Sequence, residues 1–224
     1  MEYSYNRINL DTQRKGRALK INPLFDVWDF LTHGGNLGLI FWALLLTSVV
    51  LAVISVLRYS EQRSLTHLWN WFARVTIAGL WWQQSLWKTP PNYGAAANGS
   101  GGLRFWMEQM VHNASTSLQS HLVANVMLPH FAFFAPQVYF AEVTIAVLLM
   151  LGLFNRVAAI LGALMALNLW LGLYRSSSEW IWEYFFLLVI QVTFLIVRPG
   201  LSWGADVLLR NKSLGRFDWL KQLA

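Results

Sequence analysis

The sequence contains no cysteine. This absence excludes disulfides, thiolate metal sites, iron–sulfur clusters and persulfide chemistry on a cysteine. Charged residues are also scarce, at 12% of the 224 residues, whereas soluble domains have about 25%. Together with a positive mean hydropathy of +0.41, this scarcity places the chain among integral membrane proteins.

The motifs that hold common cofactors are absent as well. The chain has no Walker loop, dinucleotide fingerprint or flavin motif, so no bound cofactor is predicted. Its five histidines show no ligand spacing, and we predict no metal site. The net charge of +6 lies in the ends and loops, without a basic patch interleaved with aromatic residues. This pattern indicates contact with membrane lipid and no nucleic-acid partner.

Long apolar runs, in contrast, are plentiful. A helix that crosses a bilayer needs about 20 mostly apolar residues. Five segments reach or approach this length: 37–57, 68–88, 131–153, 157–174 and 180–197. We therefore predict an all-α integral membrane protein. The chain begins with a basic arm, 1–36, in which 23–32 is either an interfacial helix or part of a partly ordered tail, and it ends with a basic tail, 211–224.

The connection 89–130 separates the second and third apolar runs. It opens with Pro90-Pro91, which cannot continue a helix, and passes a flexible glycine-rich tract at 94–102. From residue 103, apolar residues recur every three or four positions: Leu103, Met107, Val111, Ala114, Leu118, Leu122 and Val126. This period predicts an amphipathic helix that either lies on the membrane surface or packs on its own protein.

The second run, 68–88, combines three tryptophans in seven residues with two glutamines and two cations. Polar side chains are costly on lipid, so we expect a stripe of Arg74, Gln84 and Lys88 to face the other helices, while Trp82 faces lipid or the interface. Because Pro90-Pro91 ends the helix, Lys88 should stay at the membrane edge.

Two acidic residues fall in the apolar runs. Glu142 lies near the middle of its run. It is either functional, as a proton acceptor or as a contact for a ligand ring, or a structural carboxylate paired with an arginine or Gln191. Glu183 lies in the first turn of the last run, where the helix dipole favours a carboxylate, so a capping role competes with catalysis.

The last four runs resemble the DoxX/DoxD family. The shared features are Arg74, Gly79 and Trp87-Lys88, then Ala141-Glu142, the stretch Leu151-Gly-Leu-Phe-Asn-Arg156, and Arg198-Pro-Gly-Leu-Ser leading to Gly204-Ala-Asp206. The resemblance covers about residues 65–210 and implies a four-helix bundle in a prokaryotic plasma membrane with a cytoplasmic C-terminus. The run 37–58 is then an additional transmembrane helix.

Members of the DoxD type are the membrane subunit of thiosulfate:quinone oxidoreductases. The resemblance therefore implies a redox-complex subunit that oxidises thiosulfate or a related sulfur anion, with quinone as electron acceptor and other subunits as partners. On this hypothesis Glu142 and Glu183 are the candidate proton donors. The candidate anion-binding residues are Arg74, Lys88, Arg104 and Arg175, of which the last three are expected to converge at one mouth or to contact lipid headgroups separately. The alternative is a non-catalytic structural or assembly subunit.

Overall fold

The computed structural model describes residues 35–95, 102–211, 219 and 222–223. Throughout these residues the chain forms helices and turns and no strand. The long helices are α3 (Gly35–Arg58), α4 (Leu65–Leu86), α7 (Phe131–Leu151), α8 (Asn155–Gly172) and α9 (Ile181–Val197). Each coincides with one of the five apolar runs, which confirms the all-α prediction. The arm 1–34, with its segment 23–32, and most of the predicted tail 211–224 lie outside the described residues.

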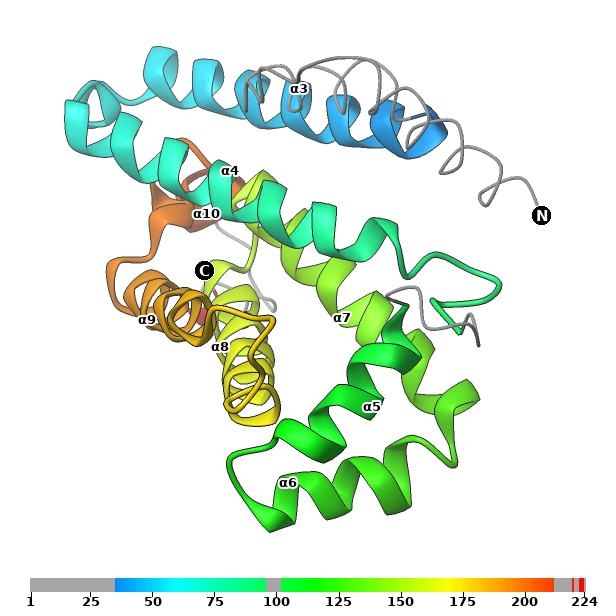
Figure 1. The fold of residues 1–224 in the computed structure, drawn as a ribbon. Coiled ribbons are helices and arrows are strands. Elements are labelled where there is room, and N and C mark those ends of the chain that lie inside the picture. Colours follow the sequence, from blue (N-terminus) through cyan, green and yellow to red (C-terminus); the bar gives the residue numbers. More distant parts are fainter. Residues whose placement is uncertain (1–34, 96–101, 212–218, 220–221, 224) are drawn as a thin grey trace, which may run out of the picture. The chain divides into compact units, whose positions relative to one another are not determined.

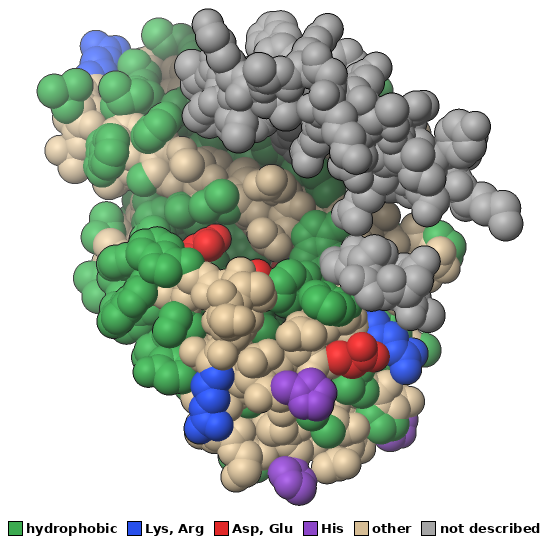
Figure 2. Space-filling view, viewed as in Figure 1, with side chains coloured by type: hydrophobic (Ala, Val, Ile, Leu, Met, Phe, Trp, Pro, Cys, Tyr) green, Lys and Arg blue, Asp and Glu red, His purple; other side chains and the backbone are tan. Residues whose placement is uncertain are grey.

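The apolar helices have the dimensions of membrane helices. Helices α3, α7 and α8 are long and apolar enough to cross a bilayer, α9 is a shorter apolar helix, and α4 is more polar. Large hydrophobic side chains are exposed on α9, including Phe186, Val189 and Ile196. Figure 2 shows hydrophobic side chains gathered over this helix, at the left of the view. Exposed apolar side chains on such a helix are explained by contact with lipid.

Residues 43–224 form one unit in which neighbouring long helices pack in chain order. Helix α4 packs on α7, α7 on α8, and α8 on α9 (Figure 1). The last two are joined closely because Gly162 on α8 has no side chain. A Cβ there would stand 2.5 Å from the side chain of Gln191 on α9. This is the close approach that small residues permit between membrane helices.

Helices α4 and α7 run antiparallel, and their register positions the candidate site. In the first half of α4, Arg74 bonds the backbone carbonyls of Leu149 and Met150, at the end of α7. Just beyond the end of α4, Lys88 meets Glu142, at the middle of α7. Helix α4 therefore ends halfway along α7, and a different segment covers the remaining half.

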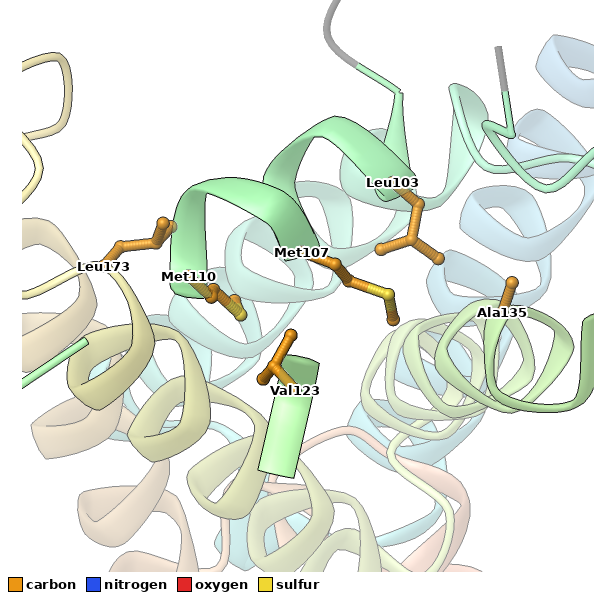
Figure 3. Close-up of a cluster of buried hydrophobic side chains, with 6 residues drawn as sticks. All are labelled: Leu103, Met107, Met110, Val123, Ala135 and Leu173. Carbon is orange, nitrogen blue, oxygen red and sulfur yellow. The ribbon is translucent and has the colours of Figure 1, made fainter. Parts of the chain in front are cut away.

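That segment is the connection 89–130, which folds as α5 (Leu103–Asn113), α6 (Ser117–Leu122) and the π-helix η2 (Val123–Met127). Its buried apolar residues pack against the first turns of α7 and the end of α8 (Figure 3). The cluster is Leu103, Met107, Met110, Val123, Ala135 and Leu173. The segment thus packs on its own protein, at the half of α7 that α4 does not cover.

The predicted apolar face is correct only as far as α5. Leu118 is 79% exposed, and Leu122 and Val126 are also exposed, whereas Val123 is buried. Helix α5 ends at Ala114. Thr116 then caps the new helix α6, because its side chain accepts a hydrogen bond from the Gln119 backbone N–H. This turn and the π-helix change which positions of the segment face the protein. A single helical period drawn from 103 to 126 therefore predicts the wrong residues as buried after α5.

Candidate functional site

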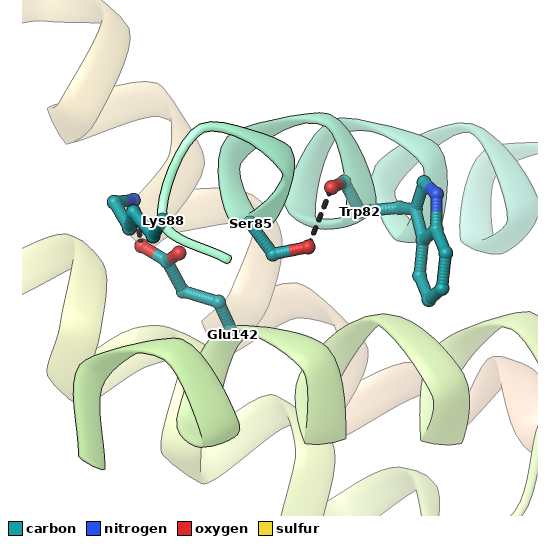
Figure 4. Close-up of polar contacts among 4 residues, drawn as sticks. All are labelled: Trp82, Ser85, Lys88 and Glu142. Carbon is teal, nitrogen blue, oxygen red and sulfur yellow. Dashed lines mark hydrogen bonds and ion pairs between the residues drawn. The ribbon is translucent and has the colours of Figure 1, made fainter. Parts of the chain in front are cut away.

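The centre of the bundle contains a buried ion pair. Lys88 Nζ lies 2.5 Å from Glu142 Oε1, and the two residues are 4% and 2% exposed. Figure 4 shows Lys88 reaching from the end of α4 to the carboxylate on α7. The sequence-based prediction that Glu142 is buried with a polar partner is confirmed. The partner is Lys88, and not an arginine or Gln191.

Polar and aromatic groups surround this pair. Lys88 Nζ also lies 4.0 Å from the centroid of the Trp87 ring, which is a cation–π contact. Glu142 Oε2 is buried and has no hydrogen-bond partner among the residues that the structure describes. One turn before Glu142, the Tyr139 ring meets Tyr93 from the loop after α4, with centroids 5.9 Å apart. The pair therefore has a charged donor, an open acceptor atom and two phenols nearby.

Helical periodicity brings Lys88 inward. The buried stripe of α4 is Arg74, Ile77, Ala78, Trp81, Trp82, Ser85 and, just past the helix end, Lys88. Gln83 and Gln84 are exposed, so the predicted inward Gln84 and outward Trp82 are both wrong. At about 100° per residue, position 84 is turned about 80° away from Arg74, while position 85 is turned only about 20°. The four-residue spacing of Gln84 and Lys88 is real, but it does not place Gln84 on the Arg74 side.

Arg74 joins a second buried site at the other end of the bundle. Its Nη1 donates to the Met150 carbonyl at 2.9 Å and also to the Leu149 carbonyl. Next to it, Asp206 accepts from the backbone N–H groups of Phe154 at 2.7 Å and Asn155 at 3.0 Å. These contacts tie the turn after α7 to helix α10 (Ala205–Arg210).

Glycines make this second site tight. A Cβ on Gly152 would lie 2.7 Å from the Arg74 guanidinium, and its φ of +63° also suits glycine. A Cβ on Gly200 would lie 2.3 Å from Asp206 Oδ2. The motifs that carry the DoxX resemblance thus lie next to one another in the fold. Arg74 serves the fold there, because its hydrogen bonds join α4 to the end of α7.

The remaining predicted site residues stand apart from the ion pair. Arg104 is exposed and pairs with Glu108 at 3.3 Å on the surface of α5. Arg175 is also exposed, and its backbone N–H bonds the Asn113 carbonyl at the opposite end of α5. Glu183 is exposed in the first turn of α9, as expected. Since Lys88 is buried and neutralised by Glu142, the predicted mouth of three converging cations is not formed, and Lys88 is not a free cation at the membrane edge.

Sequence analysis missed the pairing of Lys88 with Glu142 and the role of Trp87. A signal for the pairing was present: one acid in an apolar run and one lysine at the end of another. The register that joins them is a tertiary property. Among the residues that the structure describes, no three histidine, aspartate or glutamate side chains gather in a way that could hold a metal ion.

Comparison of the sequence with known proteins gives a match to one family model. The family model described as DoxX matches residues 100–175, a segment that contains α5, α6, α7 and α8 and therefore Glu142. No curated protein matches the chain, and no solved structure does. Residues 100–175 thus match the DoxX family model, and the protein is an all-α membrane protein with a DoxX domain in this segment.

Proposed function

We propose that this chain is the integral membrane subunit of a redox complex that passes electrons to quinone, and that the Lys88–Glu142 pair handles the protons of this reaction. The observation that carries the proposal is the ion pair buried at the middle of α7. Ionisable side chains inside a membrane are expensive and usually serve function. A buried ion pair is also weak evidence for stability, because apolar residues of similar volume often stabilise a core as well or better.

The chemistry suits the composition of the site. A quinone becomes a quinol by taking up two electrons and two protons. The Lys88 ammonium can donate a proton, and Glu142, whose Oε2 has no hydrogen-bond partner among the described residues, can accept one and return it to the lysine. Trp81, Trp82 and Trp87 provide an apolar and aromatic surrounding at this end of α4.

The electrons come from a sulfur anion on this proposal, with thiosulfate as the simplest donor. Two thiosulfate ions form one S–S bond and release two electrons, which a partner subunit transfers to the quinone. The exposed cations Arg104 and Arg175 are the candidates for attracting the anion, because Arg74 and Lys88 are both buried and engaged.

Replacing Glu142 by Gln tests the proton role. We expect thiosulfate-dependent reduction of decylubiquinone, in membranes containing the whole complex, to fall at least tenfold, because general acid–base groups contribute about 10²–10⁴-fold. Protein level and thermal midpoint should stay near those of the wild type. The matched control is Glu108→Gln, which removes an exposed carboxylate from α5 and should leave the rate unchanged. Full activity of Glu142→Gln would refute the proposal.

A second candidate function is a structural or assembly subunit, which is favoured by the way the ion pair joins α4 to α7. The double variant Lys88→Met with Glu142→Leu separates the two functions. For a purely structural pair, an apolar replacement is neutral or stabilising and the complex keeps its activity. For a proton-handling pair, the complex assembles but quinol formation is lost.

A further inference from the structure

The last two turns of α4 and the residue after them expose an unusual surface. Leu80, Gln83, Gln84 and Trp87 are all exposed, on the side opposite the stripe that packs on α7. Two carboxamides on the outer face of a membrane helix are costly unless they find a hydrogen-bonding partner. The surface lies beside the buried ion pair, because Trp87 directly precedes Lys88.

Of Trp87, Lys88 and Glu142, only Trp87 reaches the surface of the protein. Trp87 is 38% exposed, whereas Lys88, which contacts its ring, is 4% exposed and Glu142 is 2% exposed. The Lys88 ammonium contacts the ring at 4.0 Å from the centroid and contacts the carboxylate at 2.5 Å. From the outside inward, the order is therefore aromatic ring, ammonium and carboxylate.

Gln83 completes the surface. It precedes Trp87 by four residues, and side chains with this spacing are neighbours on a helix, with Cβ atoms about 5–6 Å apart. A planar ring that stacks on Trp87 would therefore have the Gln83 amide within reach of one edge. Leu80, one turn earlier, extends the surface with an apolar side chain.

We infer that Gln83 and Trp87 form the docking surface for the quinone ring, which enters from the lipid phase. The inference rests on the proposed function and names the site at which its electron acceptor binds. A quinone has the required chemistry: a flat ring for stacking, a carbonyl oxygen that accepts from the Gln83 amide, and an apolar tail that remains in lipid. Trp87 holds the ring, and the Lys88 ammonium lies 4.0 Å from the centroid of the same indole, with Glu142 beyond it.

Steady-state kinetics test the docking surface in the whole complex. For Trp87→Leu and Gln83→Leu we expect the KM for decylubiquinone to rise about tenfold while kcat stays within twofold, because both residues bind the ring and neither transfers a proton. The control is Trp69→Leu, which removes a 66% exposed tryptophan from the same helix about 27 Å away and should leave KM unchanged. An unchanged KM in both test variants, or an equal rise in the control, would overturn the inference.

Photolabelling tests the same surface without any turnover. The full chain in lipid nanodiscs is irradiated with an azido-ubiquinone, and the labelled peptides are mapped by mass spectrometry. We expect label on the peptide that contains Gln83 and Trp87, competition by decylubiquinone, and at least a fivefold loss in Trp87→Leu. Label elsewhere, or label insensitive to Trp87, contradicts the inference.

The variant Glu142→Gln separates this inference from the proposed function. If Glu142→Gln is labelled like the wild type but is inactive, both the docking surface and the proton role stand. If it is labelled and fully active, the docking surface stands and the proton role fails. If the wild type is not labelled on α4 while Glu142→Gln is inactive, the proton role stands and the docking surface fails.

Discussion

Asp206 shows at the scale of single residues how a motif in the sequence becomes a structural contact. Its carboxylate receives the Phe154 and Asn155 backbone N–H groups, and its own N–H bonds the Gly152 carbonyl at 2.8 Å. Burial nevertheless raises the pKa of Asp206 to about 6, against the opposing effects of these two N–H donors and of Arg74. An acid that is buried in this way titrates close to physiological pH.

This pKa gives a prediction for stability. Between about pH 4 and pH 6 the folded state holds a proton on Asp206 that the unfolded state has lost, so the free energy of unfolding falls as the pH rises through this range. The contribution is at most about 3 kcal/mol. We expect the thermal midpoint in detergent to decline from pH 4 to pH 6.5, and to decline less in Asp206→Asn. Equal pH dependence in both proteins would contradict the assignment.

At the scale of helices, the sequence predicts where the long helices lie and how long they are better than it predicts which side of each helix faces the rest of the protein. The run 131–153 corresponds to α7 and 157–174 to α8, because a mostly apolar stretch of this length leaves few alternatives to a membrane helix. The inward side of α4 was predicted only in part. Arg74 and Lys88 face inward as expected, but Trp82 takes the place predicted for Gln84, since a tryptophan suits either lipid or a protein core. The partner of Glu142 could not be predicted, because it depends on the register of α4 against α7.

The contact between α8 and α9 gives a prediction at the same scale. Gly162→Ala should lower the thermal midpoint, because the new Cβ would stand 2.5 Å from the buried Gln191 side chain and overpacking costs about 1–3 kcal/mol. Gln191→Ala in the same chain should restore most of the loss, which a double-mutant cycle measures as coupling. The control is Gly79→Ala on α4, where a Cβ meets nothing within 4 Å and helix propensity favours Ala. A loss that Gln191→Ala leaves uncorrected would contradict this contact.

For the whole molecule, the two polar sites lie at different depths along α4. Arg74 and Lys88 are fourteen residues apart, which is about 21 Å of helix. The Arg74 site closes one end of the bundle, where α4 begins and α7 ends. The Lys88–Glu142 pair lies near the bundle centre, and the α5–α6 segment packs beyond it, against the first turns of α7. This arrangement separates the contacts that hold the fold from the residues proposed for chemistry.

The orientation of the molecule follows from the same arrangement. Ser60 lies before α4, on the side where α7 ends and α8 begins, and Ser177 lies between α8 and α9, on the opposite side. The first side carries more basic residues among those described: Arg58, Arg63, Arg156, Arg198 and Arg210. Lys88 does not count for the other side, because it is buried and paired. The basic side is expected to face the cytoplasm.

Single thiols test this orientation, and the absence of native cysteine makes each variant uniquely labelled. A membrane-impermeant maleimide should react with Ser177→Cys in right-side-out vesicles and with Ser60→Cys only in inverted vesicles. Labelling after detergent treatment confirms that both thiols are reactive. If both positions react from the same side, at least one of the helices α4, α7 and α8 does not cross the membrane. If the two sides are reversed, the basic residues of this protein face outward and the proposed quinone site opens toward the other half of the bilayer.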